Sequence, residues 1–197
     1  YQLADALARK LLLDGVEWDG VTFKNPLRLL VTGHPSQLRE QVGFKLTALL
    51  LLAKELPAGA TLHLFGDDVE HDPRAFALAA DVIAGRTRGP ALGEVLRGIG
   101  VHGDYVDGIR QLADEVVPRE AVERLWIRLV RAPDGSRIAT FDDRVVGWTS
   151  AGALATALEG LGLVTPGDGA RVRERAPGGT IVPGAAGRDP AGFWSGR

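Results

Sequence analysis

A long helix, a short apolar strand and a second helix follow one another near the middle of the sequence, and this order constrains the fold more than any other feature. Residues 37–56 have the length and apolar content of a helix. Residues 61–65 predict a buried strand, and residues 72–83 predict a helix with Asp72 as its N-cap and Pro73 in its first turn. Helices and strands that alternate in this way indicate an α/β protein with a parallel sheet.

The composition changes twice along the chain and divides it into three predicted parts. Residues 1–90 carry the alternating pattern of the α/β domain. Residues 91–164 read as a smaller α+β appendage, with a strand at 125–130 whose hairpin partner is expected at 137–141. Residues 165–197 are rich in Gly, Pro and Arg and poor in large apolar residues, so we expect a flexible, mostly disordered tail.

The bulk composition excludes several classes of function. The 197 residues carry a formal net charge of -2 and no basic cluster, so we expect no nucleic-acid partner. No apolar run reaches the roughly 18 residues of a membrane span, and no signal-like segment is visible, so we expect a cytoplasmic protein without a transmembrane segment. The absence of cysteine excludes disulfides and thiolate metal sites.

Acidic residues crowd the loop after the first predicted strand, where open α/β sheets bind ligands. Gly66 is expected to let the backbone turn tightly there. Asp67 and Asp72 bracket a short loop, so their carboxylates can converge on one Mg²⁺ ion, which usually takes one or two protein carboxylates. Asp68 is a third candidate metal ligand, although Asp68 and Glu70 can also be read as solvated loop charges.

Each of these residues also has a purely structural interpretation. Asp72 can serve only as a helix cap. Lys45 stands among apolar residues of the long helix, so it is either a snorkelling lysine or a fixed positive charge beside the carboxylates and a phosphate. We expect His63 to be a core or interface histidine, whereas His71 lies in the loop and could touch a substrate.

Two motifs resemble those of a known superfamily. Gly43-Phe44-Lys45 on a helix, followed by an apolar strand and Gly66-Asp67-x-x-x-x-Asp72, looks like the third and fourth motifs of the haloacid dehalogenase superfamily. The loop Gly66-Asp67-Asp68-Val69-Glu70-His71-Asp72-Pro73 is similar to that of actin-patch-type phosphatidate phosphatases and their uncharacterised bacterial relatives. The resemblance covers residues 3–83 and implies a partial Rossmannoid parallel sheet.

The resemblance also implies a reaction. Lys45 would be the catalytic residue that holds the phosphoryl charge, Asp67 would ligate Mg²⁺, and Asp72 would support the metal through water or through the lysine. The implied activity is Mg²⁺-dependent hydrolysis of phosphomonoesters through an aspartyl-phosphate. The implied substrate is a phosphorylated small molecule or a lipid phosphate.

The nucleophile of such an enzyme is missing from this sequence. Members of the superfamily carry Asp-x-Asp at the end of a strand, and no apolar strand here ends in that motif. Glu17-Trp18-Asp19 has glutamate in the nucleophile's place, and Thr32 lies too close to Lys45 to be the second motif. Since the chain opens at Tyr1 and contains no methionine, we expect a fragment that is inactive alone, with the nucleophile upstream in a longer parent.

Two other interpretations remain open at the level of sequence. The chain could be a non-catalytic relative that serves as a binding or regulatory module, whose acids only cap and turn the backbone. It could also be a receiver like those of response regulators, in which clustered aspartates bind Mg²⁺. The later threonine and lysine strands of a receiver are not recognisable after Asp67.

Overall fold

The computed structural model describes residues 2–18, 20, 37–101, 103–141 and 143–184. The chain divides into two compact units, residues 1–35 and residues 36–197. In the first unit, α1 (Gln2–Leu13) confirms the expected helix, and Leu12 and Leu13 at its end are exposed. The segment around Thr32, considered above as a second motif, lies outside the described residues.

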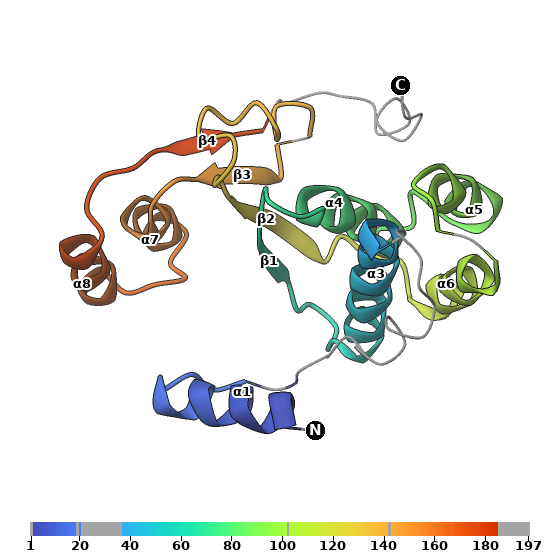
Figure 1. Cartoon of the computed structure of the whole chain (residues 1–197), viewed down its shortest axis with the longest axis horizontal. Helices are drawn as coiled ribbons and strands as arrows, with labels where there is room; N and C mark the ends of the chain where they lie inside the picture. The colour runs from blue at the N-terminus through green and yellow to red at the C-terminus, as the bar shows by residue number, and fades with distance from the viewer. Residues whose placement is uncertain (1, 19, 21–36, 102, 142, 185–197) are drawn as a thin grey trace. The chain divides into compact units, whose positions relative to one another are not determined.

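The second unit is built on an open sheet of four strands in the order β1-β2-β3-β4 (Figure 1). The first three strands run parallel, and the last is antiparallel to its neighbour. This arrangement confirms the predicted α/β class with a mostly parallel sheet. In chain order the elements are α3 (Gln37–Glu55), β1 (Leu62–Asp67), α4 (Asp72–Ile83), α5 (Gly89–Gly98), α6 (Asp104–Glu115), β2 (Val122–Arg128), β3 (Val145–Trp148), α7 (Ala151–Gly160), α8 (Pro166–Arg175) and β4 (Ile181–Pro183).

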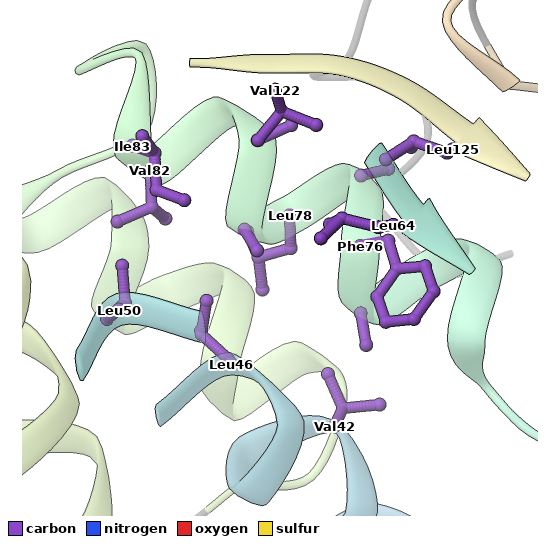
Figure 2. Packing of buried hydrophobic residues seen from close by; sticks show 14 of the residues in the cluster. Val42, Leu46, Leu50, Leu64, Phe76, Leu78, Val82, Ile83, Val122 and Leu125 are labelled. Carbon is purple, nitrogen blue, oxygen red and sulfur yellow. The ribbon is translucent and has the colours of Figure 1, made fainter. Parts of the chain in front are cut away.

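The core lies where α4 packs against one face of β1 and β2 and α3 packs against α4. Side chains alternate between the two faces of a strand, and Leu64 and Leu125 both point to the face that α4 covers (Figure 2). α4 is rich in alanine and is buried along almost its whole length, so it can lie close to both the sheet and α3. The core continues across residue 90 into α5, α6 and β2 without a break.

The strand expected at 137–141 is wrong. β2 pairs with β3 in a parallel ladder, and residues 137–141 form consecutive turns between the two strands. Ile138 and Phe141 are both buried, and their spacing of three places both side chains inward in a helical turn, whereas a strand would point them to opposite faces.

The expectation of a disordered tail from residue 165 is also wrong for residues 166–183. The Thr165 hydroxyl caps α8 by accepting a hydrogen bond from the Asp168 backbone N–H at 3.2 Å, and Pro166 opens the helix, so the low apolar content is offset by good cap chemistry. β4 then pairs with β3. The rest of the predicted tail, residues 185–197, lies outside the described residues. None of the helices described here is long and apolar enough to cross a bilayer.

Candidate functional site

Gly66 makes room for a carboxylate rather than for a tight turn. It lies within β1, and its φ angle is not in the left-handed region. A Cβ atom at this position would lie 2.7 Å from the Cβ of Asp72, which is closer than real Cβ atoms come to other carbon atoms. The glycine therefore allows the start of α4 to pack directly against the end of β1.

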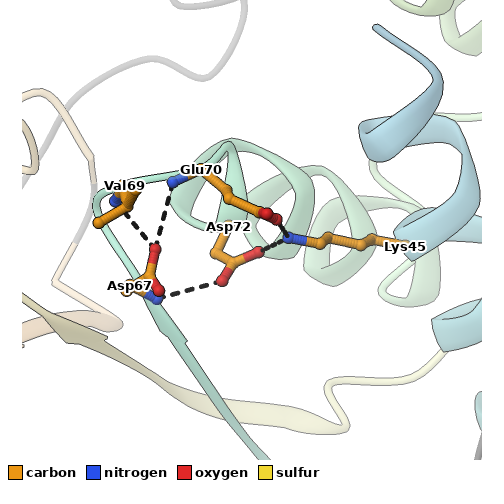
Figure 3. A network of polar contacts seen from close by, with 5 residues as sticks. All are labelled: Lys45, Asp67, Val69, Glu70 and Asp72. Carbon is orange, nitrogen blue, oxygen red and sulfur yellow. Dashed lines mark hydrogen bonds and ion pairs between the residues drawn. The ribbon is translucent and has the colours of Figure 1, made fainter. Parts of the chain in front are cut away.

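Asp72 is the first residue of α4 but does not cap the helix. The N-cap position is His71, which makes no side-chain cap hydrogen bond. The prediction of Asp72 as the N-cap was therefore wrong by one residue. Asp72 is buried, and its Oδ2 accepts a hydrogen bond from the Asp67 backbone N–H at 3.1 Å. Its Oδ1 forms an ion pair with the Lys45 ammonium (Figure 3). The two contacts fix both oxygens of the carboxylate.

The Lys45 ammonium is held between two carboxylates. Besides Asp72, it contacts Glu70 Oε2 at 2.6 Å, so the lysine extends from α3 to the loop after β1 (Figure 3). Burial works against the charged form of Lys45, but hydrogen bonds and charges of Asp72 and Glu70 outweigh it and raise its pKa above the ordinary value. Lys45 is therefore a cation at neutral pH and stands beside the carboxylates, while its contact with a phosphate stays a prediction.

Asp67 keeps one oxygen for a ligand. Its Oδ1 accepts hydrogen bonds from the backbone N–H groups of Val69 at 2.9 Å and Glu70 at 3.2 Å, which shape the loop. Its Oδ2 accepts no hydrogen bond from any residue that the structure describes. Among the described residues, this is an open carboxylate oxygen at the carboxyl end of a parallel strand, a position where a Mg²⁺ ligand is expected.

The site does not contain a complete cage of protein ligands. Within the described part of the chain, no group of three or more His, Cys, Asp or Glu side chains is arranged to hold a metal ion. Mg²⁺ usually keeps several waters and takes one or two carboxylates, so Asp67 fits as one ligand and leaves the remaining positions to water, substrate or a residue from elsewhere.

Asp68 is neither a solvated charge nor placed as a metal ligand. It is 2% exposed, and its two oxygens accept hydrogen bonds from the backbone N–H groups of Val130 at 2.7 Å, Arg131 at 2.9 Å and Ala132 at 2.8 Å. Burial alone would raise the pKa of Asp68, but these donors outweigh it and lower the pKa. The carboxylate therefore ties the loop after β1 to the loop after β2.

Two residues near the site were missed by sequence reasoning. Glu70 was read as a solvated charge, yet it holds the Lys45 ammonium. Arg137 donates from Nη1 to the Asp68 carbonyl oxygen at 2.5 Å. The position of Glu70, two residues before Asp72, could have indicated that it also contacts Lys45. No local sequence pattern indicates that Arg137 contacts the acidic loop.

The two histidines occupy different environments. His63 accepts a hydrogen bond at Nδ1 from the Trp126 indole N–H at 3.3 Å, in keeping with the core or interface position expected for it. His71 is partly buried at the start of α4. Burial, followed by the charges of Arg74, Lys45 and Arg137, lowers the pKa of His71, so its imidazole is neutral at pH 7.

Comparison with known proteins adds no relative. A scan against protein-family models and searches among curated proteins and solved structures found no match for this chain.

The role assigned to Asp68 can be tested by stability. Asp68→Asn preserves shape but places an amide NH₂ against backbone donors, so we expect a loss of about 1–3 kcal/mol in the free energy of unfolding, measured by urea denaturation at pH 7. Asp134→Asn is the control, because Asp134 makes a similar turn hydrogen bond to Ser136 on the surface. Equal effects of the two substitutions would contradict the role of Asp68.

The same comparison has a defined pH dependence. Because folding lowers the pKa of Asp68, its stabilising contribution is present above the ordinary carboxyl pKa and is lost as the pH falls through the lowered value. The difference between the wild-type chain and Asp68→Asn should therefore persist at mildly acidic pH and shrink only in strong acid. A difference that already disappears near pH 6 would argue against a lowered pKa.

The position of the Lys45 ammonium can be tested through His71. Lys45→Met removes a neighbouring positive charge and leaves Glu70 unpaired, and both changes favour the imidazolium form. We expect the pKa of His71 to rise, as measured by NMR titration of the imidazole, with assignment by His71→Gln. Lys54→Met is the control, because Lys54 pairs with Glu115 farther along the same helix. An unchanged His71 pKa in Lys45→Met would place the ammonium elsewhere.

Proposed function

We propose that this chain supplies the lysine and the metal-binding acid of a Mg²⁺-dependent phosphomonoester hydrolase, which acts through an aspartyl-phosphate in a full-length parent. The observation that carries the proposal is the joining of Lys45, Asp72 and Asp67 at the carboxyl end of β1 (Figure 3). A fixed cation beside a ligating carboxylate is what transfer of a phosphoryl group requires.

Each residue has a defined task in this proposal. Lys45 binds the phosphoryl oxygens, and Asp72 and Glu70 hold its ammonium in place. Asp67 Oδ2 would hold the Mg²⁺ ion, which would supply positive charge to balance that of the transferring group. The substrate is a phosphorylated small molecule or a lipid phosphate.

The open edge of the sheet gives the nucleophile a place. β1 is an edge strand of the described sheet, and its outer edge pairs with no described strand. A strand that paired there in parallel would end beside Asp67, about 4.8 Å away across the ladder. In this proposal the nucleophilic aspartate ends such a strand, so the described residues alone do not catalyse the reaction.

A second candidate is a non-catalytic binding or regulatory module with the same fold. The observation that favours it is the full pairing of the Lys45 ammonium by Asp72 and Glu70, which would serve equally well as a structural brace. Titration calorimetry of the full-length parent with Mg²⁺ and beryllofluoride separates the two candidates, because only a hydrolase site with its nucleophilic aspartate binds this phosphoryl mimic in a manner that depends on Mg²⁺.

The decisive experiment is a kinetic assay of the full-length parent with p-nitrophenyl phosphate and Mg²⁺. Asp67→Asn and Lys45→Met should each lower kcat/KM by about 10²-fold or more, because each removes a charge that stabilises the transition state. Lys54→Met should be unaffected, since Lys54 pairs with Glu115 outside the site. Equal activity of Asp67→Asn and wild type would overturn the proposal.

The chain alone provides a second test. We expect no turnover from the purified 197-residue chain under the same conditions. Turnover that Asp67→Ala abolishes would show that the nucleophile lies within this sequence, contrary to the proposal.

A further inference from the structure

The last paired residues of the three parallel strands form one row across the sheet. Asp67 pairs with Arg128, and Arg128 pairs with Trp148. Because these strands run in the same direction, the row lies at their carboxyl ends, the edge where α/β sheets bind ligands. An arginine therefore stands on the strand next to the proposed metal ligand.

Lys45 and Arg128 approach this edge from opposite faces of the sheet. Leu125 and Ile127 point into the core beneath α4, so Arg128 points to the other face by the alternation of side chains along the strand. Lys45 comes from α3, which packs with α4 on the core side (Figure 2). The carboxyl end of β1 thus has a cation on each side.

The backbone of Arg128 is fixed relative to the acidic loop. Its carbonyl oxygen accepts a hydrogen bond from the Asp68 backbone N–H at 3.0 Å, and the Asp68 carboxylate holds the residues that follow. The guanidinium carbon lies 5.8 Å from the centroid of the Trp148 ring. The Trp148 indole nitrogen is buried without a partner among the described residues, so the ring contributes through its face rather than through its N–H.

The charge of Arg128 is open to a ligand. Its side chain is exposed and forms no ion pair with any residue that the structure describes. Arg86 and Arg173 differ in this respect, because Arg86 forms an ion pair with Asp81 and Arg173 forms one with Glu159.

We propose that Arg128 binds a second anionic group of the substrate, so that the enzyme selects phosphomonoesters whose leaving group carries a carboxylate or a further phosphate. The inference rests on the proposed function and names its substrate class. The planar guanidinium offers paired N–H donors that match either anion, and it lies within cation–π range of the Trp148 ring. Arg128 is thus a specificity residue, distinct from the groups that hold the phosphoryl.

The experiment compares two small phosphomonoesters that differ in one charge. Ethyl phosphate and 2-phosphoglycolate are titrated into the purified chain with constant Mg²⁺, and binding is followed by NMR at the Val69 and Glu70 amides and the Trp148 indole N–H. Wild type should bind 2-phosphoglycolate about tenfold more tightly than ethyl phosphate, which is the effect of one charge-assisted hydrogen-bonded contact.

Matched variants identify the source of that preference. Arg128→Gln should abolish the tenfold preference while leaving ethyl phosphate binding unchanged. Arg124→Gln is the control, because Arg124 lies on the same face of β2 at its amino end, beside His63. It should retain the full preference.

The outcomes separate this inference from the proposed function. If neither probe shifts the Val69 and Glu70 amides, the proposed function fails and the inference fails with it. If both probes bind equally to wild type, or if Arg128→Gln weakens both equally, the specificity role is wrong and the phosphoryl site stands.

Discussion

The ion pair between Lys45 and Asp72 is the interaction on which the architecture of the site depends. It joins α3 to the start of α4 across the carboxyl end of β1, between residues 27 positions apart. Removing the two charges from water is costly, and such pairs rarely repay that cost in stability alone. Gly66 has no side chain and so leaves room for the Asp72 carboxylate, and the Asp67 backbone N–H donates a hydrogen bond to it. Several residues thus act together to hold the Lys45 ammonium in place.

A second anchor makes the surroundings of the site rigid. Asp68 binds three successive backbone N–H groups of the loop after β2, and its own N–H extends the pairing of β1 with β2. The acidic loop therefore cannot move independently of β2. This coupling fixes the backbones of Asp67 and Arg128, which are partners in the ladder, relative to each other at one edge of the sheet.

The sequence predicted the features that depend on local residue patterns. Apolar runs indicated α3, β1 and β2, and the pair Asp72-Pro73 indicated the start of α4. The expectation that Lys45 stands beside the acidic loop agrees with the structure. The role of Asp68 escaped prediction because its partners lie 62 to 64 positions away, and only the parallel pairing of β1 with β2 brings them near. The prediction of a strand at 137–141 was wrong for a related reason. The burial of Ile138 against the rest of the core, and not the β-propensity of the segment, determines its conformation.

The charge of the cluster argues for a cation in the proposed function. In their ionised forms, Asp67, Glu70 and Asp72 outweigh the single Lys45 ammonium by two negative charges. That excess of negative charge opposes the approach of a phosphoryl dianion to Lys45. One divalent cation on Asp67 Oδ2 would cancel the excess and leave the ammonium free to attract phosphate. Metal binding is thus the physical condition that distinguishes a phosphohydrolase site from a structural brace made of the same residues.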